Sequence, residues 1–167
     1  MKFYLIRHGD AVPSQALNAD AIRPLSKLGE AEVTINGKWL HRHLQQQGVE
    51  QLDWLISSPY IRARQTAAIV QQHCAAIQQS ESADATPDGD PQQFADWLFA
   101  ELAVNHARAQ HVALVSHMPF VSYLVQTLDA TRQPIVFPTA SIAEFELDLA
   151  MLRGTFQRLI VPETILT

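Results

Sequence analysis

The sequence has one cysteine, an excess of acidic over basic residues and no long apolar run. Cys74 has no second cysteine for an internal disulfide, and 12 Lys and Arg against 17 Asp and Glu give a formal net charge of −5. Nucleic-acid-binding surfaces are normally basic, so we expect no nucleic-acid partner. The apolar run from Val112 to Val115 is far shorter than the roughly 20 residues of a transmembrane helix, so we expect no membrane segment. With no signal-peptide pattern after Met1, these features predict a cytoplasmic protein.

Metal-binding patterns are missing too. The sequence has no carboxylate cluster suited to a divalent cation, and its histidines lack the companions that a zinc site needs. We therefore expect no metal and no other cofactor. A length of 167 residues with 47% hydrophobic content predicts one domain over residues 1–167.

Three short apolar runs are typical of strands buried on both faces: Phe3 to Ile6, Leu52 to Ile56 and Val112 to Val115. Four helices are expected, from Ser26 to near Gly48, from Ser58 to about Ala76, over 92–106 and from Pro119 to about Leu128. An alternating pattern over 142–161, broken near 153–154, predicts a terminal antiparallel pair. This order predicts the α/β class, a three-layer α/β/α sandwich whose mostly parallel sheet has an antiparallel C-terminal edge.

The spacing of apolar residues also predicts which helix faces are buried. In the first helix the expected core residues are Leu28, Ala31, Ile35 and Trp39. In the second they are Ile61, Ala68 and Ile69. We expect residues 78–91, rich in Asp, Ser and Pro, to form a surface connection, and the long polar stretch 10–24 to border a site.

Three polar clusters follow the three apolar runs: Arg7-His8-Gly9, Ser57 to Arg62, and Ser116-His117-Met118-Pro119. Parallel strands that end at one edge of an α/β sheet bring such clusters together where ligands bind. We therefore expect two arginines and two histidines in one pocket, although the first and last cluster lie more than a hundred residues apart.

These residue types suit phosphoryl transfer. Arg7 and Arg62 offer planar forks of donors that match phosphate oxygens. His8 is the candidate nucleophile, since a neutral imidazole can attack phosphorus, and Gly9 leaves its line of attack uncrowded. His117 would stabilise the charge that develops on the oxygens. The predicted catalytic set is thus His8, Arg7, Arg62 and His117.

The same motifs resemble the histidine phosphatase (phosphoglycerate mutase-like) superfamily. Its arginine-histidine-glycine triplet after the first strand corresponds to Leu5-Ile6-Arg7-His8-Gly9, its second motif to Ser57 through Thr66, and its serine-histidine pair to Ser116-His117. The resemblance implies that His8 is phosphorylated in the intermediate and that Arg7 and Arg62 line the phosphate pocket.

Within the superfamily, the short chain, the continuation Asp10-Ala11 and the block Arg23 to Gly29 are most similar to the SixA-type phosphohistidine phosphatases. This likeness implies a substrate phosphorylated on histidine, carried by a signalling or phosphocarrier protein, as the partner. Because side chains supply the positive charge that a magnesium ion provides in many phosphoryl-transfer enzymes, we expect a phosphatase that needs no metal and keeps its activity in a chelator.

Other candidate residues come with alternatives. Arg23 either contacts substrate phosphate or only precedes a helix entry, and Ser58 is a helix cap whose amide could face the phosphate. The resemblance implies an acidic proton donor before the third motif, and Asp84 matches it best. Asp88, Asp90 and Asp10 compete with Asp84 for that role.

Two other functions remain open at this point. A phosphatase of small phosphorylated metabolites would need a tight, walled pocket. A non-catalytic module that binds phosphorylated proteins would need the arginines but not the nucleophile, so the presence of both histidines argues against it.

Overall fold

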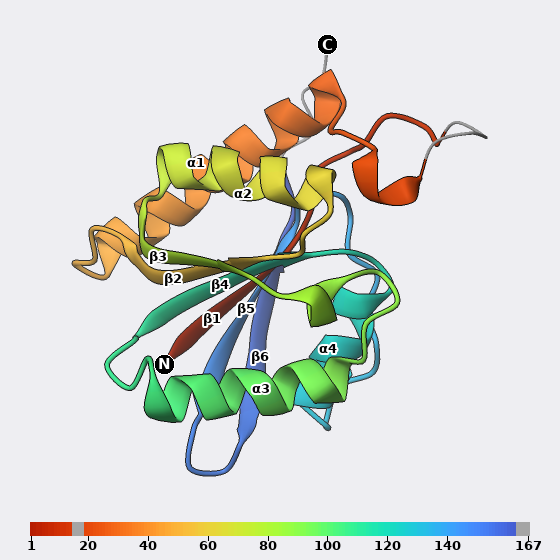
Figure 1. Ribbon diagram of the computed structural model, residues 1–167. Helices are drawn as coiled ribbons and strands as arrows, with labels where there is room; N and C mark the ends of the chain where they lie inside the picture. Colours follow the sequence, from red (N-terminus) through yellow and green to blue (C-terminus); the bar gives the residue numbers. More distant parts are fainter. Residues whose placement is uncertain (15–18, 163–167) are drawn as a thin grey trace.

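The computed structural model describes residues 1–14 and 19–162, which form helices around a six-stranded sheet (Figure 1). The strands are β1 (Lys2–Arg7), β2 (Leu52–Ser57), β3 (Ala76–Glu81), β4 (His111–Ser116), β5 (Ile142–Asp148) and β6 (Arg153–Ile160). Their order across the sheet is β3-β2-β4-β1-β5-β6. β1 to β4 run parallel, whereas β5 and β6 pair antiparallel. The expected mostly parallel sheet with an antiparallel C-terminal edge is confirmed.

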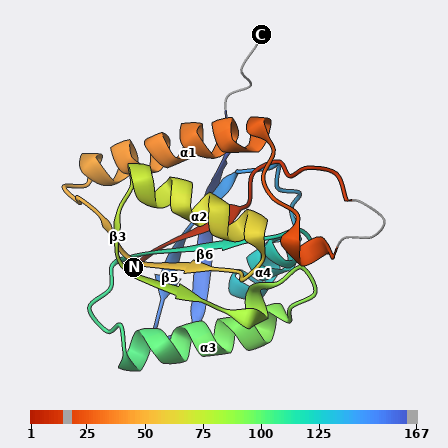
Figure 2. The same cartoon turned by 45° about the horizontal axis from the view of Figure 1, so that its top comes forward.

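Helices cover both faces of this sheet. α1 (Lys27–Gln46) and α2 (Ile61–His73) pack on one face, and α3 (Pro91–Val104) and α4 (Phe120–Leu128) pack on the other (Figures 1 and 2). Successive side chains of β1 point to opposite faces of the sheet. Phe3 and Leu5 pack in the core under α3 and α4. Tyr4 and Ile6 pack in the core under α1 and α2. None of the helices in residues 1–14 and 19–162 is long and apolar enough to span a membrane.

The predicted ends of α1 are confirmed. Ser26 Oγ accepts a hydrogen bond from the Gly29 amide at 3.0 Å, as an N-cap does. After the helix, Gly48 has φ of 74°, the left-handed conformation that glycine adopts without strain.

The predicted buried faces of α1 and α2 are only partly right: Trp39 and Ile69 pack partly buried against the core, but the fully buried residues are others. In α1 the buried residues include Val33, Asn36, Leu40 and Leu44, whereas Leu28 is 58% exposed. In α2 the buried residues are Arg62, Ala63, Thr66, Ala67 and Val70. Both helices turn small and polar residues inward, because they pack closely on each other and border a polar site; Gly37 of α1 lies against His73 of α2.

Strand β3 was not predicted. Residues 76–81 pair in parallel with β2 at the edge of the sheet, within a stretch expected partly as helix end and partly as surface connection. Their sequence, AIQQSE, has mostly polar side chains, and most of these are exposed. An edge strand needs no apolar run on both faces, so the pattern that identified β1, β2 and β4 could not identify it.

Candidate functional site

The three polar clusters meet at one edge of the sheet. In the register of the parallel strands, Arg7 lies opposite Ser116 and Ser57 lies opposite Val115. The backbone continues this pairing beyond the strands: the His8 amide donates to the Ser116 carbonyl at 3.0 Å, and the Ser58 amide donates to the Val115 carbonyl at 3.0 Å. The predicted convergence of the clusters is therefore what the fold produces.

The His8 ring is held by a hydrogen bond to the backbone of the next residue. Its Nδ1 lies 2.6 Å from the Gly9 carbonyl oxygen, and the residue is only 6% exposed. A carbonyl can only accept, so Nδ1 carries the ring proton and Nε2 presents a lone pair. Arg62 Nε donates to this Nε2 at 3.2 Å. The nucleophilic nitrogen thus faces a guanidinium group.

His117 lies directly beside His8. The two ring centroids are 5.0 Å apart, and the Tyr60 ring packs edge-on against His117 at the same centroid distance. His117 Nε2 lies 2.7 Å from Ser58 Oγ. Its Nδ1 is buried and has no hydrogen-bond partner among the residues that the structure describes. One polar atom of this buried ring therefore has its hydrogen-bonding capacity unused by the described residues.

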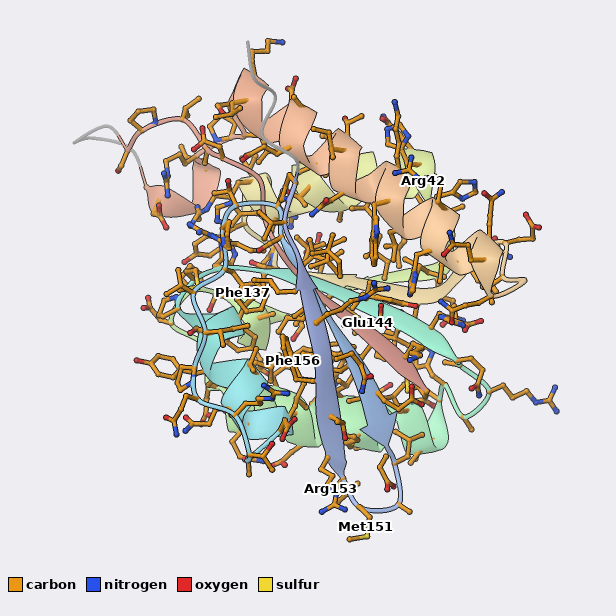
Figure 3. All side chains as sticks on the ribbon, turned by 180° about the vertical axis from the view of Figure 1, so that it is seen from behind. Arg42, Phe137, Glu144, Met151, Arg153 and Phe156 are labelled. Carbon is orange, nitrogen blue, oxygen red and sulfur yellow. The ribbon has the colours of Figure 1, made fainter. Side chains whose placement is uncertain are left out.

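Arg7 and Arg62 are anchored from outside the pocket. Arg7 Nη1 donates to the Phe137 carbonyl at 2.5 Å, and Phe137 lies in the segment that joins α4 to β5 (Figure 3). Arg7 Nε is buried and, within residues 1–14 and 19–162, unpartnered. Arg62 Nη1 donates to the carbonyl of Asp20 at 2.8 Å, and its Nη2 lies 2.9 Å from the Asp20 carboxylate.

Burial and positive charge keep both histidines neutral. Burial, together with the charges of Arg62, Arg7 and Arg23, lowers the pKa of His8 from 6.5 to about 4, against the opposing effect of the Gly9 hydrogen bond. Burial, His8 and the same arginines lower the pKa of His117 to about 2. Both rings are therefore uncharged at neutral pH, and the positive charge of the site belongs to the arginines.

The packing of α1 against Gly9 leaves no room for a side chain there. A Cβ added there would lie 2.7 Å from the Gly29 carbonyl oxygen and 2.8 Å from Val33 Cγ2, both in α1. The glycine thus permits close packing of α1 against the chain after His8, and the expectation that it also clears a line of attack stays a prediction. The Gly9 amide donates to Thr66 Oγ1 at 3.2 Å, which ties it to α2.

Asp20 is a site residue that the sequence did not reveal. It belongs to the short 3-10 helix η1 (Asp20–Ile22), and its carboxylate contacts both Arg62 and Arg23, the latter at 3.2 Å from Nε. Burial raises the pKa of Asp20, but the hydrogen bonds and charges of these arginines outweigh that effect and lower it. The only signal was its position in the long polar stretch 10–24, which was expected to border a site.

Arg23 shares the Asp20 carboxylate with Arg62, and its contact with substrate phosphate stays a prediction. Besides Asp20, its Nη1 contacts the Val12 carbonyl at 3.2 Å, and its charge helps to lower the pKa of both site histidines. Arg64, in contrast, points away to an exposed ion pair with Glu81 at 2.8 Å. Arg62 and Arg64, the two arginines of the second motif, therefore have different surroundings: Arg62 lies in the site, and Arg64 lies at the surface.

The prediction for Ser58 is wrong in its details. α2 begins at Ile61 with Tyr60 at the N-cap position, so Ser58 does not cap it, although its Oγ accepts from the Tyr60 amide at 3.3 Å. Its own amide is bonded to Val115 and is not available to a phosphate. The side chain instead contacts His117.

The side chain of Asp84 contacts helix α3. It is part of the 3-10 helix η2 (Ala83–Ala85), which is tied to β4 by a hydrogen bond of 2.7 Å from Ser116 Oγ to the Ala85 carbonyl. Its carboxylate accepts from Gln93 Nε2 of α3 at 3.3 Å. Within the described ranges it makes no hydrogen bond to the four residues of the predicted catalytic set.

The geometry fits an anion that carries a transferable group. A neutral imidazole nitrogen, whose lone pair accepts from Arg62, lies among guanidinium groups and beside a second neutral imidazole, at the strand ends where α/β sheets bind ligands. No group of three or more His, Cys, Asp or Glu side chains in the described part of the chain is arranged to hold a metal ion. The fold and site define an α/β protein of the phosphoryl-transfer type.

Comparisons with known proteins agree with a phosphoryl-transfer site. A model of the histidine phosphatase superfamily (branch 1) matches residues 3–84. The phosphohistidine phosphatase SixA homolog of Haemophilus influenzae is 30% identical over 151 residues, which are 89% of each chain. Phosphohistidine phosphatase SixA of Escherichia coli (strain K12) is 33% identical over 158 residues, which are 93% of this chain and 91% of that protein.

A solved structure of the protein histidine phosphatase SixA, complexed with tungstate, superimposes with a TM-score of 0.83 at 32% identity and covers 97% of both chains. The chain belongs to the histidine phosphatase superfamily.

Proposed function

We propose that this chain is a phosphohistidine phosphatase, which removes the phosphoryl group from a histidine of a partner protein through a phospho-His8 intermediate. The observation that carries the proposal is the orientation of His8, whose Nδ1 is bonded to Gly9 and whose Nε2 faces Arg62. Relatives named phosphohistidine phosphatase SixA, or its homolog, match about nine tenths of the chain and support the choice of substrate.

In the first step, His8 Nε2 forms a bond to phosphorus while the bond from phosphorus to the substrate imidazole breaks. When the substrate ring is protonated on its other nitrogen, it leaves as neutral imidazole, and the positive charge passes to the His8 ring. Nδ1–H of the charged ring then donates more strongly to the Gly9 carbonyl. No separate proton transfer is needed for this exchange between two imidazoles.

In the second step, water forms a bond to phosphorus, the bond to His8 Nε2 breaks, and dihydrogen phosphate leaves with both protons of the water. Arg7 and Arg62 neutralise the phosphoryl oxygens, His117 donates to them, and the charge of Arg23 adds to the attraction. Asp84 is the candidate proton donor for substrates with a poorer leaving group, such as an alcohol. All positive charge in this scheme comes from side chains.

The proposed partner is a histidine-phosphorylated phosphotransfer or phosphocarrier protein, and the proposed location is the cytoplasm. The chain covers 97% of the SixA structure and is matched over the same share, which leaves little room for inserted segments that would wall off the site. We propose that residues 1–167 form one catalytic domain.

The test incubates the purified protein and His8→Ala with a histidine-phosphorylated carrier protein, a sugar phosphate and an aryl phosphate. We expect turnover of the phosphorylated carrier by the wild type only, unchanged by a chelator. Turnover of the sugar and aryl phosphates alone would instead support a metabolite phosphatase. Binding of phosphorylated carrier with no turnover of any substrate would support the non-catalytic module.

A further inference from the structure

The two site histidines bond to the protein through opposite ring nitrogens. His8 contacts the protein through Nδ1, at the Gly9 carbonyl, and presents Nε2. His117 contacts the protein through Nε2, at Ser58 Oγ, and its Nδ1 is the buried atom without a partner in the described residues. The partner of His8 is an obligate acceptor, but a hydroxyl can donate or accept, so the proton position on His117 depends on Ser58.

The surroundings of Ser58 decide which way its hydroxyl points. Ser58 is fully buried, and its Oγ already accepts from the Tyr60 amide at 3.3 Å. Within residues 1–14 and 19–162, His117 Nε2 is the acceptor within reach of the hydroxyl hydrogen. If Nε2 carried the ring proton instead, the hydroxyl hydrogen would be buried without an acceptor, which costs free energy.

The same choice decides what His117 offers to a ligand. With the hydroxyl donating to Nε2, the ring proton sits on Nδ1, and the unpartnered atom is a donor. With the opposite tautomer, Nδ1 would present a lone pair, which repels phosphoryl oxygens. Protonating both nitrogens is disfavoured because the ring is buried among arginines.

We infer that Ser58 is a positioning residue that holds neutral His117 in the Nδ1–H tautomer, so that His117 donates a hydrogen bond to the phosphoryl group in flight. This inference rests on the proposed function and assigns Ser58 a role different from direct phosphate binding. Both site histidines then carry their proton on Nδ1. In His8 that proton is engaged by the backbone and frees a nucleophile, whereas in His117 it is free and serves as a donor.

The first measurement reads the tautomer directly in the protein without substrate. Long-range nitrogen–proton NMR correlations distinguish the protonated from the unprotonated imidazole nitrogen, and His117→Gln assigns the signals. We expect His117 to carry its proton on Nδ1 in the wild type, and the Nε2–H form to appear in Ser58→Ala. A wild-type His117 protonated on Nε2 would overturn the inference, whatever the substrate of the enzyme proves to be.

The second measurement compares kinetics with a matched control. Ser58→Ala should lower kcat by about 10- to 100-fold with KM changed much less, because the lost donor acts mainly in the transition state. Ser122→Ala, which removes another buried hydroxyl bonded to the Ile135 carbonyl, should keep the wild-type kcat. An unchanged kcat in Ser58→Ala would overturn the inference.

A second variant and a second substrate complete the test. If circular dichroism shows that Ser58→Ala does not fold, Ser58→Cys keeps a small side chain with a weaker donor, and its kcat should fall below that of the wild type; an unchanged kcat again overturns the inference. Running both an aryl phosphate and a phosphohistidine protein separates the two claims. If the wild type hydrolyses the aryl phosphate but not the phosphohistidine protein, the proposed substrate is wrong, and the role of Ser58 can still be tested with the aryl phosphate.

Discussion

Arg62 donates through Nε to His8 Nε2, the nitrogen that must attack phosphorus, across 3.2 Å. The other arms of the same guanidinium group are held by the carbonyl and carboxylate of Asp20. Arg62 therefore touches the nucleophile before any substrate binds. An incoming phosphoryl group must come between them, which places its phosphorus next to Nε2 and its oxygens next to the guanidinium group.

Arg62→Lys should lower kcat/KM for phosphohistidine protein by about 100-fold, because an ammonium group cannot contact His8, the phosphoryl oxygens and Asp20 at once. Steady-state kinetics measure this directly. Arg64→Lys is the matched control: its side chain is in an exposed pair with Glu81, and the variant should behave as the wild type. Equal losses in the two variants would contradict the assignment of Arg62.

Asp20→Asn should tighten the binding of inorganic phosphate by about 2- to 5-fold, because it removes a negative charge from arginines that bind a dianion. The effect is small since the Asp20 side chain is 50% exposed. Product inhibition gives the inhibition constant. Asp96→Asn, the same change of charge on α3, should leave the constant unchanged; weaker phosphate binding in Asp20→Asn would mean that its carboxylate serves mainly to hold Arg62.

Gly9→Ala should destabilise the fold by about 1–3 kcal/mol and reduce activity, because the new Cβ would meet a backbone carbonyl of α1 that cannot move alone. Urea unfolding and kcat report the two effects. Gly37→Ala is the control: its Cβ would lie 3.5 Å from His73 Cβ, an ordinary contact, and alanine favours a helix. We expect that variant to be as stable as the wild type or more stable, and the opposite ranking would argue against the packing role of Gly9.

Stability should fall as the pH is lowered from 7.5 to 5, partly through His8. In the unfolded chain a histidine binds a proton near pH 6.5, but burial and the neighbouring arginines lower the pKa of folded His8 to about 4. Between these values the unfolded state binds more protons, so acid favours unfolding.

His8 alone should contribute about 2 kcal/mol of this loss at pH 5. Urea unfolding of the wild type and His8→Gln at both pH values isolates that share, because the other buried histidines are common to both proteins. If the two proteins lost equal stability between pH 7.5 and 5, His8 would not be a buried neutral base.

The sequence predicted the parts of the molecule whose patterns are local. Runs such as Val112 to Val115 identify strands covered on both faces, and the parallel order of such strands brings His8, Arg62 and His117 to one edge. Strands β1, β2 and β4 could be predicted because parallel strands buried on both faces have continuous apolar sequences.

What the sequence missed depends on tertiary contacts. The buried face of α2 carries Arg62 and Thr66 because it borders the site, and a hydrophobic pattern cannot show a face made of polar residues. Asp20 lies 42 residues from Arg62 in the sequence, and no local pattern indicates that η1 contacts α2. Ser58 looked like a helix cap because serine followed by proline is a common helix start, yet the helix begins later and the hydroxyl contacts His117.

The most direct test of the account is to find where the phosphoryl group resides during turnover. The protein is mixed with phosphohistidine protein, quenched rapidly in alkali, which preserves phosphorus–nitrogen bonds, and digested for mass spectrometry. We predict one phosphoryl group on the peptide that contains His8, absent from His8→Asn and present in Arg64→Lys. A phosphoryl group on His117 or on any other residue in place of His8 would contradict the account.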